Sequence, residues 1–405
     1  MLSIVRITCL LLVFIARLSA QTLRFEEALQ RTLDCAPELQ ITAAEAQERR
    51  GDWRQSKLYP NPEFGLNVND VADDRVLAFG NTTYEITQTF EWIGKRSAKQ
   101  KAARYDYYAA CLWCERERIS VLNRLIRAFV TAMAAQEELA LAKNRKEIAE
   151  SVLKAVKDVS EAGKGSGIQY NKAEVELALA DVDLQKALLD YFIAKEALVL
   201  SWGASCPDFD DLAYPFYDVQ IPKALDACAA DLCGHPEYKA LYCRYQAARK
   251  HVCYEQASRI PDVSLTLGYE RTRDPDDSNV TVGLTVPIPV WDRNQGNIYK
   301  AKSEQVKACE HCHYRLALLK NKLALAHQEV TRAFREVQLL KDTALVISEK
   351  SFELAKEGYQ RGKFPYLDML DSQRTLFEVR DKYIQAVLQY HLSKANLDYL
   401  VTAGE

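Results

Sequence analysis

Two short clusters of cysteine and histidine are the residues of this sequence best suited to chemistry. One occupies residues 111–114 (CLWC) and the other residues 309–313 (CEHCH), and each holds two thiols separated by two residues. On a helix, side chains at positions i and i+3 share a face, so two such pairs could bind zinc or copper. The alternative is a disulfide, and the choice between them depends on the redox compartment.

Other arrangements that carry catalysis are missing from the sequence. It contains no Gly-rich phosphate loop, no nucleophile elbow and no His-Glu-x-x-His run, and the remaining histidines are scattered. The net charge of −3 lacks the basic excess that is typical of nucleic-acid-binding proteins. We therefore expect no enzyme, no cofactor, no resident metal and no nucleic-acid partner.

The N-terminus indicates the compartment. Arg6 precedes an apolar run over residues 7–15, and Ser19 and Ala20 come just before Gln21. This pattern predicts a secretory signal peptide over residues 1–20, cleaved near Ala20. No later run of eighteen apolar residues follows, so we expect no transmembrane helix in the exported protein.

An internal repeat organises the rest of the chain. Four pairs of residues recur 199 positions apart, as 236 − 37 = 199 shows for the first pair. The matching positions are Pro37 and Pro236, Pro62 and Pro261, Trp92 and Trp291, and Gly163 and Gly362. Four matches in one register indicate a duplication. We place the two repeats at residues 21–202 and 223–405, joined by a linker over residues 203–222.

Each repeat has the same predicted order of elements. A helical stretch is followed by a β-hairpin, a very long helix, a glycine-containing turn and a shorter helix. The predicted ranges are 25–57, 61–93, 95–162 and 169–201 in the first repeat, and 224–257, 261–292, 295–361 and 366–402 in the second. The long helices would each extend about 100 Å. Helices of this length are typical of extended α-barrels and coiled coils.

The four predicted strands have the pattern of membrane β-strands. Apolar residues alternate with small or polar ones over residues 262–270 and 280–290, and more weakly over 64–68 and 84–92. A half-buried sheet on a soluble core is the alternative, but two equivalent hairpins in an exported chain favour the membrane. Open sheet edges are not tolerated in lipid, and four strands cannot close on themselves. The barrel must therefore be shared, and three chains would supply twelve strands.

The predicted hairpins also bear on the cysteines. Cysteine pairs in an oxidising compartment usually form disulfides. Cys243 lies 18 residues before Pro261, and Cys309 lies 18 residues after Trp291. Both would lie at a similar depth on neighbouring antiparallel helices. We therefore favour a disulfide from Cys243 to Cys309 or Cys312 over a metal site.

Four sequence runs resemble the TolC-type outer-membrane efflux family. They are residues 58–63 (LYPNPE), 88–96 (QTFEWIGKR), 287–296 (PIPVWDRNQG) and 366–373 (YLDMLDSQ). The resemblance covers the chain from Thr22 to about Leu400. The first two runs look most like the branch that serves cobalt–zinc–cadmium or copper–silver resistance pumps.

The resemblance implies a fold, a location and partners. The fold is mainly α with a four-stranded membrane β-sheet. It forms a trimeric twelve-stranded outer-membrane barrel continuous with a long periplasmic α-helical barrel. The expected function is a passive exit duct, for heavy-metal cations. Its expected partners are outer-membrane lipid, a periplasmic adaptor (membrane fusion) protein and an inner-membrane pump of the resistance-nodulation-division type.

The resemblance also assigns a periplasmic aperture. The family's acidic ring matches Asp368 and Asp371, where carboxylates from three chains would attract cations. Without the resemblance, these acids would be read as ordinary residues of a helix N-terminal turn. The first repeat has Gln169 and Lys172 at the equivalent positions, so the ring is not doubled. Tyr359 matches the family's aromatic residue before the turn.

One departure from the family pattern concerns closure of this aperture. Phe364 stands where some relatives have a basic gate residue. We therefore expect the tip to close through Tyr359 and contacts between neighbouring helices.

Three other functions stay open at this point. The duct could carry drugs or secreted proteins, because the fold does not fix the cargo. The chain could instead be a periplasm-spanning coiled-coil protein, which would not need two matched hairpins. A cysteine-ligated metal buffer is the third alternative.

Overall fold

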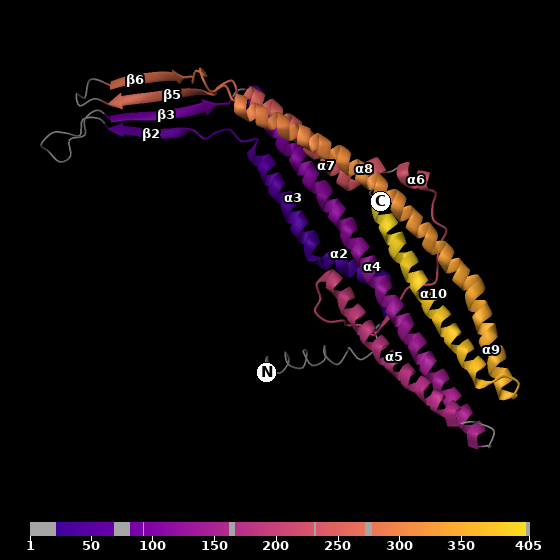
Figure 1. Ribbon diagram of the computed structural model, residues 1–405. Helices are drawn as coiled ribbons and strands as arrows, with labels where there is room; N and C mark the ends of the chain where they lie inside the picture. The colour runs from indigo at the N-terminus through magenta and orange to yellow at the C-terminus, as the bar shows by residue number, and fades with distance from the viewer. Residues whose placement is uncertain are drawn as a thin grey trace, which may run out of the picture.

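The computed structural model describes residues 22–68, 82–91, 93–161, 167–230, 232–271 and 278–401. The chain is elongated, with a four-stranded sheet at one end and long helices that run from it to two helical tips (Figure 1). No helix within these ranges has an apolar stretch long enough to cross a bilayer. The predicted signal peptide, Trp92 and the turn at Gly163 lie outside the described residues.

Prolines divide the first helical stretch of each half of the chain. The continuous helix expected over residues 25–57 is instead α2 (Phe25–Cys35) and α3 (Pro37–Gln55). The helix expected over 224–257 is divided into α6 (Leu225–Ala230), the 3₁₀ turn η2 (Leu232–Gly234) and α7 (Pro236–Ala257). A proline tolerates the first helical position but forces the preceding residue out of the helical region. Ala36 and His235 accordingly have ψ values of 119° and 130°.

The long helices match the sequence prediction closely. α4 (Ile93–Glu161) has 69 residues, which corresponds to about 100 Å. Its counterpart is α8 (Gln295–Leu339), a π-helical segment η3 (Leu340–Leu345) and α9 (Val346–Gln360). The shorter returning helices are α5 (Gly167–Val199) and α10 (Tyr366–Val401), whose first residues are 366 − 167 = 199 positions apart. The same elements thus recur at the spacing of the sequence repeat.

The sheet is fully antiparallel. Its order is β2 (Glu63–Val68), β3 (Thr82–Phe90), β5 (Val263–Arg271) and β6 (Ser278–Thr285), so the two predicted hairpins pair through β3 and β5. The register aligns apolar residues across all four strands, as in the row Phe64–Ile86–Leu267–Val282. All four of these side chains are exposed. The opposite face is polar, with the Thr87 and Thr266 hydroxyls 2.9 Å apart.

A compact core joins the two halves midway along the helices. Strand β1 (Thr22–Arg24) pairs in parallel with β4 (Asp211–Ala213), inside the segment predicted as a linker. The Gln136 side chain accepts a hydrogen bond from the backbone N–H of Leu212 at 2.8 Å, and the Tyr217 ring stacks on Tyr383 at 5.5 Å. These contacts fix the segment over residues 203–222 against α4 and α10.

The helices form a layer that is open at both edges. Near the tips the contacts run from α5 to α4, to α10 and to α9; near the sheet they run from α3 to α4, to α7 and to α8 (Figure 1). One edge of the molecule is therefore β2, α3 and α5. The other edge is β6, α8 and α9.

Candidate aperture and conduit wall

The turn between α9 and α10 is defined by backbone hydrogen bonds. Gly362 has a φ of 71°, a left-handed conformation that suits glycine. Its N–H donates to the Tyr359 carbonyl at 2.9 Å, and the Lys363 N–H donates to the Gly358 carbonyl at 2.8 Å. This pairing is a Schellman motif, which ends a helix and reverses the chain. The Phe364 ring lies against Gly358, where any Cβ atom would be 2.0 Å from the ring.

Tyr359 packs inside the tip. Its ring contacts the Tyr366 ring with centroids 5.9 Å apart, and Tyr366 is buried in a cluster with Val156 and Met369. Both hydroxyls are buried and have no hydrogen-bond partner among the described residues. Burial raises the pKa of Tyr359 and raises that of Tyr366 to about 12. Tyr359 therefore contributes to packing between α9 and α10 within one chain.

Asp368 and Asp371 are exposed on the first turns of α10. Neither carboxylate forms an ion pair within the described part of the chain. Arg374, one turn further on, pairs with Glu176 of α5 and so links the two tips. On α5, Gln169 is half-buried and Lys172 is exposed. The structure thus places all four predicted tip residues at the end of the helices farthest from the sheet, with the acids on one tip only (Figure 1).

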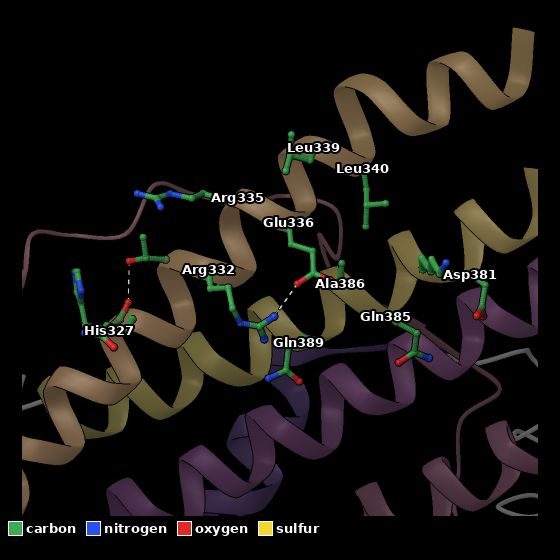
Figure 2. Close-up of a pocket in the computed structure, with 13 residues that line it drawn as sticks. His327, Arg332, Arg335, Glu336, Leu339, Leu340, Asp381, Gln385, Ala386 and Gln389 are labelled. Carbon is green, nitrogen blue, oxygen red and sulfur yellow. Dashed lines mark hydrogen bonds and ion pairs between the residues drawn. The ribbon is translucent and has the colours of Figure 1, made fainter.

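A groove lies between α8 and α10, on the sheet side of the π-helical segment (Figure 2). Its volume is about 1210 Å³. Arg332 pairs with Glu336 at 3.1 Å on its α8 wall, and Asp381 and Gln385 lie on the α10 wall. His327, at the end of the groove nearer the sheet, contacts the Lys223 carbonyl at 2.8 Å. The groove therefore presents charges of both signs.

A second cavity, of about 390 Å³, lies between α4, α5 and α10 and shares Asp381 with the groove. Glu138 accepts a hydrogen bond from Gln385 there. Burial raises the pKa of Glu138, and the nearby Asp381 and Asp190 carboxylates raise it further. Three helices thus bring Glu138, Asp190 and Asp381 together around this cavity, which Arg145, Lys186 and Arg374 also line. No sequence pattern predicts this cluster, because only the register between helices brings residues 138, 190 and 381 together.

The cysteines predicted to pair lie on adjacent antiparallel helices. Glu237 of α7 and Arg315 of α8 form an ion pair at 2.7 Å. Cys243 lies 243 − 237 = 6 residues after Glu237, and Cys309 lies 315 − 309 = 6 residues before Arg315. Because the two helices are antiparallel, Cys243 and Cys309 therefore lie at the same level. Cys312 is buried beside the Tyr238 hydroxyl. All three are free thiols in this structure, and burial raises the pKa of Cys243 and Cys312. The disulfide stays a prediction.

The other thiol pair has separate neighbours. Cys114 accepts a hydrogen bond from the Thr42 hydroxyl at 3.7 Å, and Cys111 contacts the Tyr107 hydroxyl. Within the described ranges, no group of three or more histidine, cysteine, aspartate or glutamate side chains is placed to hold a metal ion.

Comparisons with known proteins agree with this architecture. The profile of the family "Outer membrane efflux protein" matches residues 28–204 and 231–402. The cobalt-zinc-cadmium resistance protein CzcC of Cupriavidus metallidurans is 30% identical over 387 residues, covering 95% of this chain and 91% of its own. The toluene efflux pump outer membrane protein TtgF of Pseudomonas putida is 25% identical, covering 92% and 81%.

Solved structures share the fold. A crystal structure of CusC aligns with a TM-score of 0.79 at 17% identity, covering 94% of this chain and 92% of that one. The expectation of a mainly helical chain with a four-stranded sheet is confirmed.

Proposed function

Because this chain belongs to the outer membrane efflux protein family, we propose that three copies assemble into a continuous duct from the periplasm to the cell exterior. The chain is an outer membrane efflux channel, a passive conduit and not an enzyme. Channels of this family work with an adaptor and an inner-membrane pump. The trimer, the closed barrel and the type of pump are the parts that we propose.

The observation that supports this assembly most strongly is the pair of open edges. The sheet leaves β2 and β6 unpaired on their outer sides, and one face of the sheet exposes aligned apolar side chains. In lipid each unpaired backbone group would cost several kcal/mol. A second copy placed head to tail pairs β6 of one chain with β2 of the next. Closure of such a ring with three copies gives twelve strands.

The helical layer supports the same arrangement. α5 and the adjoining turn expose an apolar stripe at helical spacing along one edge of the layer. The stripe consists of Ile168, Val175, Leu179, Val182, Leu189, Ile193 and Leu200. The opposite edge exposes Leu339, Val346 and Leu354 of α8 and α9. The two stripes lie on the two edges that a head-to-tail ring brings into contact, so one rotation closes both the sheet and the helical layer.

The purified protein tests this assembly directly. Light scattering in detergent should give a protein mass three times that of one chain, and planar bilayers should show ion conductance. A monomer without conductance would contradict the duct and favour a periplasm-spanning structural protein.

We further propose heavy-metal cations as the cargo and a resistance-nodulation-division pump as the energy source. CzcC, a relative named for cobalt, zinc and cadmium resistance, aligns over 95% of this chain. Exposed Asp368 and Asp371 and the cluster around Glu138 give the tip and wall acidic groups that favour cations. The second candidate cargo is a lipophilic compound, because TtgF, named for toluene efflux, aligns over 92% of the chain.

The proposed location follows from the same relatives. The sheet would lie in the outer membrane and the helices would extend into the periplasm, after removal of a signal peptide near Ala20. At the tip, Tyr359 would act within its own chain by holding α9 against α10. Closure between chains would then depend on neighbouring helices rather than on a Tyr359 bridge.

A further inference from the structure

A pocket lies at the junction between the sheet and the second long helix. Its volume is about 600 Å³. The residues that line it come from the turn after α7, from the segment between β6 and α8 and from the first turn of α8: Arg259, Val290, Trp291, Arg293, Gln295 and Ile298. In Figure 1 this junction is where β6 leads into α8. Two guanidinium groups, an indole and aliphatic side chains thus meet beside the base of the sheet.

The backbone of this pocket is held in place before any ligand arrives. Asn294 has a φ of 59°, a left-handed conformation that a residue other than glycine adopts only at a cost. Its side-chain N–H groups donate to the Glu255 carbonyl at 2.9 Å and to Glu255 Oε2 at 2.6 Å. Gln295 closes the loop by donating to the Trp291 carbonyl at 3.1 Å. These bonds anchor the loop that carries Trp291 and Arg293 to the end of α7.

The two arginines of the pocket have no ion-pair partner in the part of the chain that the structure describes. Neither the Arg259 nor the Arg293 guanidinium forms an ion pair or hydrogen bond with another described residue. Both side chains are exposed. Two cations that line one pocket, without a carboxylate partner among the described residues, leave room for an external anion.

The first repeat shows that these charges are not needed for the fold. Positions 199 residues before Arg259 and Arg293 hold Pro60 and Gly94. The basic residues at that junction are instead used internally. Lys95 pairs with Asp262 at 2.7 Å, and Arg96 bonds to the Lys57 carbonyl with its guanidinium 3.4 Å from the Tyr59 ring centre.

The surroundings of the pocket select the kind of anion. Trp291 is 87% exposed and Val290 is 52% exposed, so the pocket continues into an apolar surface. The membrane-facing side chains Val280, Val282 and Leu284 of β6 are also exposed. Guanidinium groups bind phosphate oxygens in a bidentate manner, and the first backbone N–H groups of α8 add further donors. A phosphate joined to an apolar tail matches both halves of this surface.

We propose that Arg259 and Arg293 bind the phosphate head group of an anionic phospholipid of the periplasmic leaflet, with Trp291 and Val290 against its acyl chains. There is one such site per chain and three per trimer. This proposal rests on the membrane placement of the sheet proposed above. The bound lipid fixes the depth at which the barrel meets the helices.

Native mass spectrometry of the detergent-solubilised protein tests the site and the assembly in one spectrum. The probes are phosphatidylglycerol, phosphatidylethanolamine and inorganic phosphate. We expect the trimer to retain up to three phosphatidylglycerol molecules, with weaker retention of phosphatidylethanolamine. Arg259→Gln with Arg293→Gln should lower phosphatidylglycerol affinity at least tenfold. The matched control, Lys350→Gln with Lys356→Gln, removes two exposed charges from distant α9 and should bind as the unchanged protein does.

Several outcomes would overturn the lipid site. One is undiminished phosphatidylglycerol binding by the double arginine variant. Another is displacement of the lipid by inorganic phosphate at equal concentration, which would indicate a site for a soluble anion. A third is dissociation of the arginine variant into single chains, which would assign both arginines to the contact between protomers. Failure of the unchanged protein to form trimers would instead contradict the proposed duct.

Discussion

Asp368 and Asp371 are the residues through which we propose that the tip attracts cations. Both carboxylates are exposed, and no ion pair within the described chain neutralises them. Replacement by Asp368→Asn and Asp371→Asn should therefore weaken block of the channel by multivalent cations. We expect roughly a tenfold loss of blocker affinity, or about 1.4 kcal/mol.

Planar-bilayer recordings measure this block. Lys172→Gln at the other tip serves as the control, and it should leave the block unchanged or strengthen it because it removes a positive charge. Equal block of the aspartate variant and the unchanged protein would contradict the acidic ring.

His391 gives the protein a defined sensitivity to acid. Its Nε2 lies 2.7 Å from the Phe216 carbonyl, and burial lowers its pKa below the ordinary value of 6.5. Nearby Lys394 lowers this pKa further, whereas the Phe216 carbonyl and Asp218 raise it. The unfolded chain binds the proton at a higher pH than the folded chain does. The stability from neutral His391 is therefore present above pH 6.5 and is lost as the pH falls from 6.5 through the folded pKa.

Thermal unfolding at pH 7.5 and pH 5.5 checks this. The His391→Gln variant should lose less stability than the unchanged protein between the two values. Buried His235 also has a lowered pKa, so part of the loss should persist. Exposed His313→Gln is the control and should behave as the unchanged protein does. An equal loss in all three proteins would exclude His391 as the source.

Cys243 is the thiol whose oxidation state can be predicted from both sequence and structure. It lies level with Cys309 on an adjacent helix, and Cys312 is one turn away. In protein purified from the outer membrane without reductant, we expect a disulfide-linked peptide that joins residue 243 to residue 309 or 312. Peptide mass mapping after alkylation detects this linkage. Cys206 is exposed and serves as the reference thiol that alkylates freely. Complete alkylation of Cys243 would show that no bridge forms.

At the scale of elements, hydrophobic periodicity predicted most of the fold. The long helices, the returning helices and three of the four strands are found within a few residues of their predicted ranges. The strand expected over residues 280–290 instead ends at Thr285, just before Pro287 and Pro289, which lack the N–H groups that a β-ladder needs. Strict alternation identified the strands, and the sparse glycine and proline identified the helices. The breaks at Pro37 and Pro236 could also have been predicted, because proline ends a helix at the residue before it.

Other features had no signal in the sequence. The π-helical segment Leu340–Leu345 contains neither proline nor glycine, and it forms where the second long helix curves along α10 (Figure 1). The candidate site could be predicted only in part, because some of its residues are brought together by packing and not by a sequence pattern. Asp368 and Asp371 are three residues apart on one helix, so their shared face can be read from the sequence. Glu138, Asp190 and Asp381 lie on three different helices and come together only through packing.

The apolar stripe on α5 gives the sharpest test of the helical layer. Val182 is 64% exposed at the centre of this stripe. Burial of a valine contributes about 1.5–3 kcal/mol, and the contact occurs three times in a trimer. Val182→Asp should therefore reduce the trimer to single chains in detergent while leaving the helical content of each chain intact.

Light scattering and circular dichroism measure these two properties. Thr375→Asp adds the same charge to an exposed position on α10, which lies inside the layer and not at its edge, and should stay trimeric. A trimeric Val182→Asp protein would show that α5 does not form the contact between chains.

At the scale of the whole molecule, the features that indicate a duct are separate from those that bear on its cargo. The open edges and the exposed sheet face support the proposed assembly in a membrane whatever passes through, so they cannot identify the cargo. The proposed acidic aperture would favour cations, but a passive conduit receives what its pump delivers. Cargo must therefore be measured in cells, with the pump and adaptor present.

A deletion strain challenged with zinc, cobalt, cadmium, copper and silver salts, beside a panel of dyes and antibiotics, makes that measurement. We expect growth inhibition at several-fold lower concentrations of one or more metals and unchanged tolerance of the lipophilic compounds. Complementation with the unchanged gene should restore growth, and the Asp368→Asn, Asp371→Asn gene should restore it less completely if the ring concentrates cations at the aperture. Sensitivity confined to lipophilic drugs would leave the duct in place and make the metal cargo wrong, because the family fold accommodates both.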